Sequence, residues 1–259
     1  MLLNILEEEK TSNDMIPKIV HYCWFGNNQI PPKYQSFINK WKEILHDYDF
    51  IVWNEDNFDV NKYSFTRDAY KAGNYAFVSD FVRCYALYTY GGFYFDTDVE
   101  IVKPLDVFLK ERAVLGIEDT EGGILTSFMA VEPKHPLLLS MHKEYLNRKY
   151  ILDDGSINSE VINKTLLKVI TPLGFKSIDT FQELPDGIKV FTSDYFSVYS
   201  LVTGKLNRTD NTYAIHWHSL LWVNKKTRII KFLRLKVLVP LLGRDNYQKL
   251  QKKIKSFIK

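Results

Sequence analysis

Apolar and polar residues follow one another along the first part of the chain in blocks that predict strands and helices in turn. The run from Ile19 to Trp24 is rich in β-branched and aromatic residues, as expected of a buried strand. After Pro31, apolar residues recur at the spacing of one helical face, and Phe50 to Trp53 reads as a second strand. This strand–helix–strand order predicts an α/β fold with parallel strands, whose ligands collect at the carboxyl ends of the strands.

The stretch from Asn74 to Pro104 combines this pattern with candidate chemistry. A helix-like segment ends at a Gly-Gly pair and leads through an aromatic strand to two aspartates, Asp96 and Asp98. Side chains two positions apart in a strand point to the same face, so we expect the two carboxylates to project together. Such a pair is a hard-oxygen site that suits Mg²⁺ or Mn²⁺.

The same helix carries Asp80 and Arg83, which are three positions apart and therefore share one helical face. This spacing is equally compatible with an ordinary surface ion pair. Further along, the pattern predicts two strands on either side of an acidic loop, then two helices, and then short strand-like runs whose order it does not predict. These segments are Val114–Ile117, the loop 118–123, Phe128–Val131, helices from His135 and from Ser159 to Ile170, and the runs Ile188–Phe191 and Phe196–Leu201.

The segment from Tyr213 to Trp222 holds two histidines and two tryptophans within ten residues. In an extended chain His216 and His218 share one face. An imidazole is an acceptable Mn²⁺ ligand and, when protonated, contacts phosphate. The alternative is an aromatic rim in which both histidines are satisfied by ordinary hydrogen bonds.

Charge separates the end of the chain from the rest. Residues 224–259 contain twelve Lys or Arg and one acid, a charge of +11, so that the preceding residues carry −8 of the total of +3. Because apolar residues also recur in this tail, a basic amphipathic helix on an anionic membrane surface is expected. Docking of its apolar stripe onto the preceding domain is the alternative. The acidic body and the lack of a nucleic-acid motif argue against a nucleic-acid partner.

Composition and the residue pattern indicate the cellular compartment that we expect for this protein. A chain of 259 residues with 46% apolar residues can bury a large core. Cys23 and Cys84 lie in apolar runs and are interpreted as buried free thiols, which favours a reducing compartment over a disulfide. The acidic N-terminus does not have the order of a signal peptide, and no apolar run is long enough to span a bilayer. We therefore expect a cytoplasmic protein, held peripherally at the inner face of the membrane by its tail.

Three segments in this order resemble a known family. They are Ile19–Gly26, Ser79–Arg83, and Tyr90–Val99, which reads YGGFYFDTDV. Together they resemble the DXD-containing sugar transferases of glycosyltransferase family 32 and its relatives, which include capsular-polysaccharide enzymes, yeast mannosyl-initiating enzymes and the glucosylating domain of large bacterial toxins. The resemblance covers about residues 16–223. It implies a Rossmann-like GT-A fold with a mixed central sheet over residues 1–223, to which residues 224–259 add the tail.

The resemblance also implies roles for individual residues. Trp24 would lie against the nucleobase, Asp80 and Arg83 would contact the donor sugar, and Asp98 would be the principal metal ligand. His216 would bind the metal or the diphosphate. In full, the implied catalytic residues are Asp80, Arg83 and Asp98, the metal ligands are Asp96, Asp98, His216 and His218, and the donor-binding residues are Trp24, Phe25, Gly26, Asp80, Arg83, Tyr94, Asp96, Thr97 and Trp222.

The implied activity is a metal-dependent transfer from a nucleoside diphosphate sugar, UDP-linked rather than GDP-linked, to a glycan or lipid-linked glycan with an α-linkage, in surface or capsular polysaccharide synthesis. Retention could use a covalent intermediate on Glu118, Asp119 or Glu121, or attack from the face that the leaving group vacates, which we favour because no carboxylate stands out. A metal-dependent nucleotide-sugar hydrolase and a non-enzymatic membrane adaptor are the alternative functions. The chain has neither a P-loop nor the kinase motifs.

Overall fold

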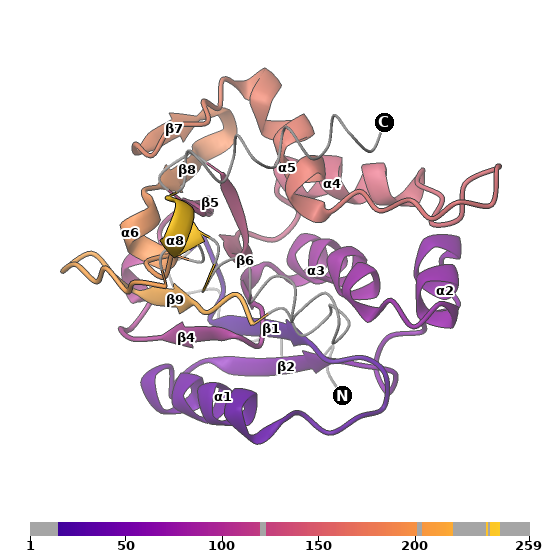
Figure 1. Cartoon of the computed structure of the whole chain (residues 1–259), viewed down its shortest axis with the longest axis horizontal. Coiled ribbons are helices and arrows are strands. Elements are labelled where there is room, and N and C mark those ends of the chain that lie inside the picture. Colours follow the sequence, from indigo (N-terminus) through magenta and orange to yellow (C-terminus); the bar gives the residue numbers. More distant parts are fainter. Residues whose placement is uncertain (1–14, 120–122, 201–203, 220–236, 238, 244–259) are drawn as a thin grey trace.

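The computed structural model describes residues 15–119, 123–200, 204–219, 237 and 239–243 (Figure 1). Most of the basic tail and Trp222 therefore lie outside the described residues, as does Glu121. The division of the chain at residue 223 remains a prediction.

A mixed sheet runs through the centre of the described chain. Its seven strands lie in the order β2-β1-β3-β6-β5-β8-β7. β1 is parallel to both β2 and β3, and β5 is parallel to β8, whereas β6 is antiparallel to its neighbours and β7 is antiparallel to β8. The bounds are β1 Ile19–Cys23, β2 Asp49–Trp53, β3 Gly92–Phe95, β5 Ala113–Ile117, β6 Ile124–Val131, β7 Gln182–Leu184 and β8 Ile188–Phe191.

Helices cover both faces of this sheet, and a small second sheet completes one side (Figure 1). The second sheet pairs β4 with β9 in antiparallel register. Its strands are β4 Val99–Ile101 and β9 Ala214–His216; the helices are α1 Pro32–Ile44, α2 Ser64–Lys71, α3 Tyr75–Tyr90, α4 Pro136–Leu146, α5 Ile162–Ile170, α6 Ser193–Phe196 and α8 Val239–Leu242, with short 3-10 turns at Asp106–Phe108, Thr171–Leu173 and Pro185–Gly187.

Strand β3 shows how the sheet separates two hydrophobic cores. Phe93 and Phe95 point to one face and pack in the core that includes α1, β4 and β9. Tyr94 points to the other face, into the core of α2 to α5. This alternation follows from strand geometry. It leaves the carboxyl end of β3 between the two helical layers, where a ligand can approach.

A buried histidine fixes the end of α3 to the sheet. His21 on β1 accepts a hydrogen bond at Nδ1 from the Trp53 indole, 3.2 Å away, while Nε2 lies 2.8 Å from the Gly91 carbonyl oxygen. Burial lowers the pKa of His21 to about 4, only partly offset by the bond to Gly91. The ring is therefore neutral at physiological pH, which lets one nitrogen accept and the other donate.

The hydrophobic pattern predicted most of these elements. The opening strand–helix–strand unit is confirmed, including its parallel pairing, and both cysteines are buried free thiols. The predicted helix from Ser159 begins at Ile162, and helix α2 was not predicted. The strand expected over Phe196–Leu201 is wrong at its start: Phe196 ends the short helix α6, and its ring stacks on Phe128 at a centroid distance of 4.1 Å in the core, whereas Ser197 and Tyr199 each form an isolated β-bridge. Among the described residues, no helix has the length and apolar character needed to cross a membrane.

The close approach of β1 to β3 depends on Gly92. Its φ is +94°, and a Cβ atom there would lie 2.4 Å from the Ile19 carbonyl oxygen. Gly73 also has a positive φ, +70°, but a Cβ atom at that position would meet nothing within 4 Å.

We expect Gly73→Ala to lower the free energy of unfolding by about 1 kcal/mol, because alanine is strained in this backbone conformation even though the space beside it is open. Gly92→Ala should cost about 2–4 kcal/mol, because overpacking adds to that strain. Urea unfolding of the two variants measures the difference, and equal losses would contradict this account.

Candidate functional site

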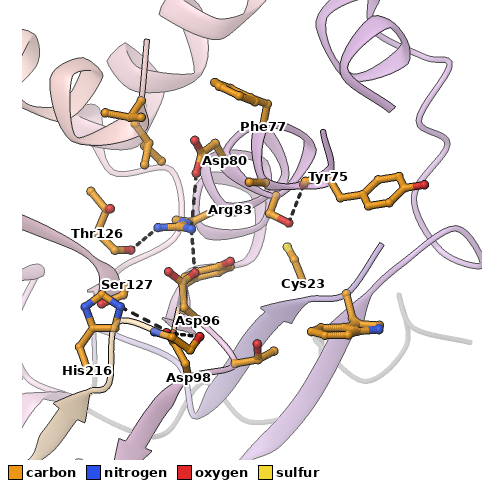
Figure 2. Close-up of a pocket in the computed structure, with 18 of the residues that line it drawn as sticks. Cys23, Tyr75, Phe77, Asp80, Arg83, Asp96, Asp98, Thr126, Ser127 and His216 are labelled. Atoms are coloured by element: carbon orange, nitrogen blue, oxygen red, sulfur yellow. Dashed lines mark hydrogen bonds and ion pairs between the residues drawn. The ribbon is translucent and has the colours of Figure 1, made fainter. Parts of the chain in front are cut away.

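A cavity of about 530 Å³ opens where the carboxyl ends of β1 and β3 meet the first turns of α3. The ends of β5 and β9, the middle of β6 and the start of α5 complete its walls. Its volume lies within the usual range for small-molecule sites, roughly 300–1,000 Å³. Figure 2 shows that side chains from several of these elements point into it.

Asp96 and Asp98 converge here, but not by the expected geometry. β3 ends at Phe95, and the two aspartates lie in a turn closed by a 3.0 Å hydrogen bond from the Val99 N–H to the Asp96 carbonyl. Strand alternation is therefore the wrong reason for their convergence, since the turn itself directs both carboxylates to the cavity. Ligand atoms of Asp96, Asp98 and His216 all lie within 4.8 Å of one another.

The second sheet brings His216 to the aspartates from far along the chain. In the β4–β9 ladder Val99 is the partner of His216, and the Trp217 N–H donates to the Asp98 carbonyl oxygen at 3.1 Å. His216 Nε2 then lies 3.6 Å from Asp98 Oδ1 (Figure 2). Register thus places a nitrogen ligand beside the carboxylate pair.

Asp98 is held in its ionised form. Ser219 donates two hydrogen bonds to Asp98 Oδ2, from its N–H at 2.7 Å and from its hydroxyl at 2.8 Å. Burial favours the neutral acid, but the charge of His216 and the two Ser219 bonds outweigh it, so that the pKa of Asp98 is lowered. Two carboxylates and an imidazole in this state fit a hard divalent cation such as Mn²⁺ or Mg²⁺.

Arg83 is the buried cation at the centre of the site. Its Nη2 donates to Asp96 Oδ1 at 2.8 Å and lies 3.5 Å from Asp80 Oδ1, while Nη1 donates to the Thr126 carbonyl oxygen (Figure 2). The guanidinium also lies over the Tyr94 ring, 4.2 Å from its centroid. Burial opposes the charge, but Asp96, Tyr94 and Asp80 together raise the pKa of Arg83. The alternative of an ordinary surface ion pair between positions 80 and 83 is therefore wrong, because both side chains belong to a buried network.

Asp80 is a carboxyl of this network whose ionised form is disfavoured by burial. Its side chain is 13% exposed. Burial raises its pKa to about 6, against the opposing attraction of Arg83 and a hydrogen bond from the Ile162 N–H. The group is ionised at neutral pH and becomes protonated as the pH falls below about 6.

Trp24, Phe25 and Gly26 follow β1 at the other end of the cavity. Trp24 and Phe25 line it, whereas Gly26 turns the chain beside it. The φ of Gly26 is +103°, and a Cβ atom there would lie 2.5 Å from the Tyr75 ring. The Gly26 N–H donates to Glu55 Oε1 at 2.6 Å. This tight turn presents the half-buried Trp24 indole to the cavity.

Glu118 follows β5 and His218 follows β9, and their side chains approach one another at the cavity. His218 Nδ1 lies 3.9 Å from Glu118 Oε1. Burial, with smaller contributions from Asp119 and Asp96, raises the pKa of Glu118 to about 7. Burial and the neighbouring His216 lower the pKa of His218 to about 3.

Sequence reasoning placed most of this site but missed some of its residues. Predicted residues that line the cavity are Trp24, Phe25, Asp80, Arg83, Tyr94, Asp96, Thr97, Asp98, His216 and His218. Ser219, Thr126 and Asn163 were not singled out. Asn163 lies at the start of α5, accepts from the Thr126 hydroxyl at 3.3 Å and donates to the Ile124 carbonyl at 2.6 Å. Only spatial proximity identifies these groups, because none belongs to a recognisable spacing.

Comparison with known proteins agrees with this geometry. Residues 31–115 match the family model described as the glycosyltransferase sugar-binding region containing the DXD motif. A mannosyl phosphorylinositol ceramide synthase of Saccharomyces cerevisiae is 30% identical over 139 residues, and inositol phosphoceramide mannosyltransferase 3 of Schizosaccharomyces pombe is 31% identical over 130 residues. These matches cover 52% and 49% of this chain and 36% of each relative, so the chain matches about a third of the length of these curated relatives. The predicted family resemblance is confirmed.

A solved structure supports the fold over a longer range. The crystal structure of a glycosyltransferase involved in glycosylation of the major capsid of PBCV-1 superimposes with a TM-score of 0.50 over 85% of this chain and 100% of its own. Sequence identity is 12%, so this likeness concerns the fold alone. The predicted glycosyltransferase-type α/β fold with a mixed sheet is confirmed.

The raised pKa of Asp80 has a consequence for stability. A carboxyl whose folded pKa exceeds its unfolded value costs nothing when both states are protonated, and it destabilises the fold increasingly as the pH rises from the unfolded pKa to the folded pKa, above which the cost is constant. We therefore expect Asp80→Asn to raise the free energy of unfolding by about 1–3 kcal/mol at pH 7.5, with the gain vanishing near pH 4. Asp153→Asn is the control, because that carboxylate is 88% exposed. Urea unfolding at the two pH values provides the test, and a loss of stability at pH 7.5 would contradict the dominance of burial.

Proposed function

We propose that this chain, whose residues 31–115 match the sugar-binding region of DXD-containing glycosyltransferases, is a metal-dependent, retaining glycosyltransferase. Its donor is a nucleoside diphosphate sugar, and its acceptor is a glycan or a lipid-linked glycan that receives the sugar in an α-linkage. The observation that carries the proposal is the contact of one buried cation, Arg83, with both Asp80 and the DXD residue Asp96. It joins the sugar side of the cavity to the metal side.

The residues along the cavity offer a position for each part of the proposed donor. We assign the nucleobase to the Trp24 indole, the diphosphate to the region of Asp96, Asp98 and His216, and the sugar to the space between Asp80 and Arg83. A divalent cation bound by Asp98 and His216, with Asp96 beside them, would neutralise charge on the leaving diphosphate. Ser219 keeps Asp98 ionised for that task through its two hydrogen bonds. Trp222, which lies outside the described residues, stays a predicted contact of the diphosphate.

The electrostatics around Asp80 suit a transition state with positive charge on the sugar ring. Asp80 is ionised above its pKa of about 6 and stays in place because Arg83 lies 3.5 Å away. A buried carboxylate that is poorly solvated gains more from a developing positive charge than a hydrated one does. Arg83, in turn, donates hydrogen bonds from a fixed position and needs no reorganisation during the reaction.

Retention is better served by attack from the face that the leaving group vacates than by a covalent intermediate. Of the carboxylates considered for that intermediate, Glu118 lines the cavity. Burial raises its pKa to about 7, so it is less fully ionised at neutral pH than an ordinary carboxylate, and a carboxyl must be ionised to act as a nucleophile. Asp119 instead accepts a hydrogen bond from the Gly123 N–H at 3.2 Å. In the favoured route a phosphate oxygen of the leaving group takes the acceptor proton.

The donor and acceptor classes extend the proposal further. We favour a UDP-sugar on the family resemblance, although the names of the matched relatives point to mannose as the sugar and inositol phosphoceramide as the acceptor. Surface or capsular polysaccharide synthesis would supply a lipid-linked glycan acceptor of related amphipathic chemistry. Hydrolysis of the donor and a non-enzymatic adaptor role are the alternatives, and the intact set of Asp80, Arg83, Asp96 and Asp98 favours transfer over the adaptor role.

Asp98→Asn should separate the metal-dependent part of donor binding from the rest. In the presence of its preferred UDP- or GDP-sugar, the wild type should unfold at a higher temperature when Mn²⁺ is added. We expect the variant to lose this shift and to lose at least a hundredfold in kcat/KM. Asp119→Asn, whose side chain caps the acidic loop, is the control. Transfer is scored by mass spectrometry over a panel of glycan and glycolipid acceptors. A metal-dependent shift that survives in Asp98→Asn would contradict the site, and donor turnover that no acceptor stimulates would favour the hydrolase.

We also propose that residues 224–259 hold the protein peripherally on the inner face of the membrane, as their charge of +11 suggests. Sedimentation with vesicles that contain anionic phospholipid should retain the full chain at low salt and release it at 0.5 M salt, a regime of roughly 4 Å screening length. A chain ending at Trp222 should stay in solution, and zwitterionic vesicles are the control. Equal binding of the full and shortened chains would contradict the role of the tail.

A further inference from the structure

The His216 imidazole belongs to two groups of potential metal ligands at once. One is the group with Asp96 and Asp98 that the proposed donor site uses. The other joins it to Glu118 and His218, and here too the ligand atoms all lie within 4.8 Å of one another. His218 was predicted to bind the donor-site cation, but it is not in the group with Asp96 and Asp98, and Glu118 is not the favoured nucleophile; both line the cavity without a role in the proposed transfer.

We propose that Glu118, His216 and His218 form a second cation site that selects Zn²⁺ and is mutually exclusive with the Asp96–Asp98 site. We assign the same ring nitrogen of His216 to both sites, so that the two sites compete. Zn²⁺ bound to the second site therefore acts as an inhibitor of the first.

The backbone at His218 supports this reading. His218 follows the end of β9 with a φ of +48°, a left-handed conformation that side chains with a Cβ atom rarely adopt. The bend returns its ring to that of His216, with the centroids 3.8 Å apart. Non-glycine residues held in this region cluster at ligand sites, where the surrounding structure maintains the strain. In this conformation His218 Nδ1 also lies 3.9 Å from Glu118 Oε1.

The spacing of the ligand atoms suits a small tetrahedral ion. His218 Nδ1 and Glu118 Oε1 are 3.9 Å apart, which is too long for a hydrogen bond. Ligands about 2.1 Å from a tetrahedral zinc ion are separated from one another by about 3.4 Å. A contraction of roughly half an ångström would therefore place this pair around an ion. Among the described residues His216 Nδ1 is buried without a hydrogen-bond partner, and His216 Nε2 lies 3.6 Å from Asp98 Oδ1.

Ligand chemistry separates the two sites. Two imidazoles and one carboxylate are a ligand set that zinc enzymes use, with a fourth position left for solvent. Two carboxylates and one imidazole are the harder set, which suits Mn²⁺ or Mg²⁺ better. The side chains of His216 and His218 are 13% exposed and that of Glu118 is 31% exposed, so the fourth position is reachable from the cavity.

The inference concerns cation binding and stands apart from sugar transfer. Only its inhibitory consequence rests on the proposed function, because a zinc-bound His216 cannot also serve the cation beside Asp98. A protein that transfers no sugar to any acceptor could still bind zinc here. The two proposals can therefore fail separately.

Calorimetric titration of the full, chelator-treated chain tests the second site. We expect the wild type to bind Zn²⁺ at one tight site, and His218→Gln and Glu118→Gln each to weaken that binding at least about tenfold. The same two variants should bind Mn²⁺ within about threefold of the wild type, whereas Asp98→Asn should show the reverse pattern. His46→Gln is the matched control, since His46 lies beside Asp47 with 80% of its side chain exposed. Thermal unfolding without metal establishes that each variant folds.

Competition and spectroscopy supply the second readout. Zn²⁺ should displace Mn²⁺ from the wild type at a lower concentration than from His218→Gln, in which Zn²⁺ can compete only directly for the Asp96–Asp98 site. Co²⁺ in place of zinc should give the intense visible bands of a four-coordinate ion in the wild type and lose them in His218→Gln. The inference is overturned if Zn²⁺ binds His218→Gln and Glu118→Gln as tightly as the wild type. Parallel losses of Zn²⁺ and Mn²⁺ affinity in every variant would overturn it too, because they would indicate a single site.

Discussion

One buried guanidinium balances the acidic groups around which this protein is arranged. Arg83 lies between Asp80 on its own helix and Asp96 in the turn after β3, with the Thr126 carbonyl as a third oxygen partner. Without a cation at this point, two carboxylates would have to lose water beside an apolar core. The energetic cost of burying unpaired charge is several kcal/mol for each ion in typical proteins. Helix α3 and strand β3 are consequently held in a fixed relation by the same contact that shapes the cavity.

The rest of the cavity depends on chain segments that approach this pair from either side. On one side β1 ends in the turn at Gly26, which needs a residue without a side chain because the Tyr75 ring fills the adjoining space. On the other side β9 pairs with β4 and brings His216 and Ser219 to Asp98. The turn after β3 of the main sheet thus supplies Asp96 and Asp98, and the small sheet brings His216 and Ser219 to Asp98 from the other side.

Local pattern was sufficient for most of the elements and for one half of the site, and it failed where long-range packing decides. The spacing of Asp80 and Arg83 revealed a shared helical face, but whether that face is solvated or buried depends on Thr126 and Tyr94, which lie on other elements. The aspartate pair was found for the wrong reason, since a turn rather than strand alternation directs it. The contact of Ser219 with Asp98 crosses 121 positions and follows only from strand register. Phe196 was assigned to a strand because hydrophobicity alone does not separate a core-packing helix end from a sheet residue.

The small sheet has an implication for how the site comes apart. The ladder between β4 and β9 comprises three residue pairs, and it holds His216 and Ser219 against Asp98. Short peripheral ladders open at far lower free energies than a central sheet, in units that act together. Fraying of this ladder would remove the imidazole and both Ser219 donors from Asp98 in one event while the seven-stranded sheet stays folded. A cation bound there would therefore connect two distant segments of the chain. The time for which it stays bound would be set by the opening of β9 rather than by the strength of any single ligand.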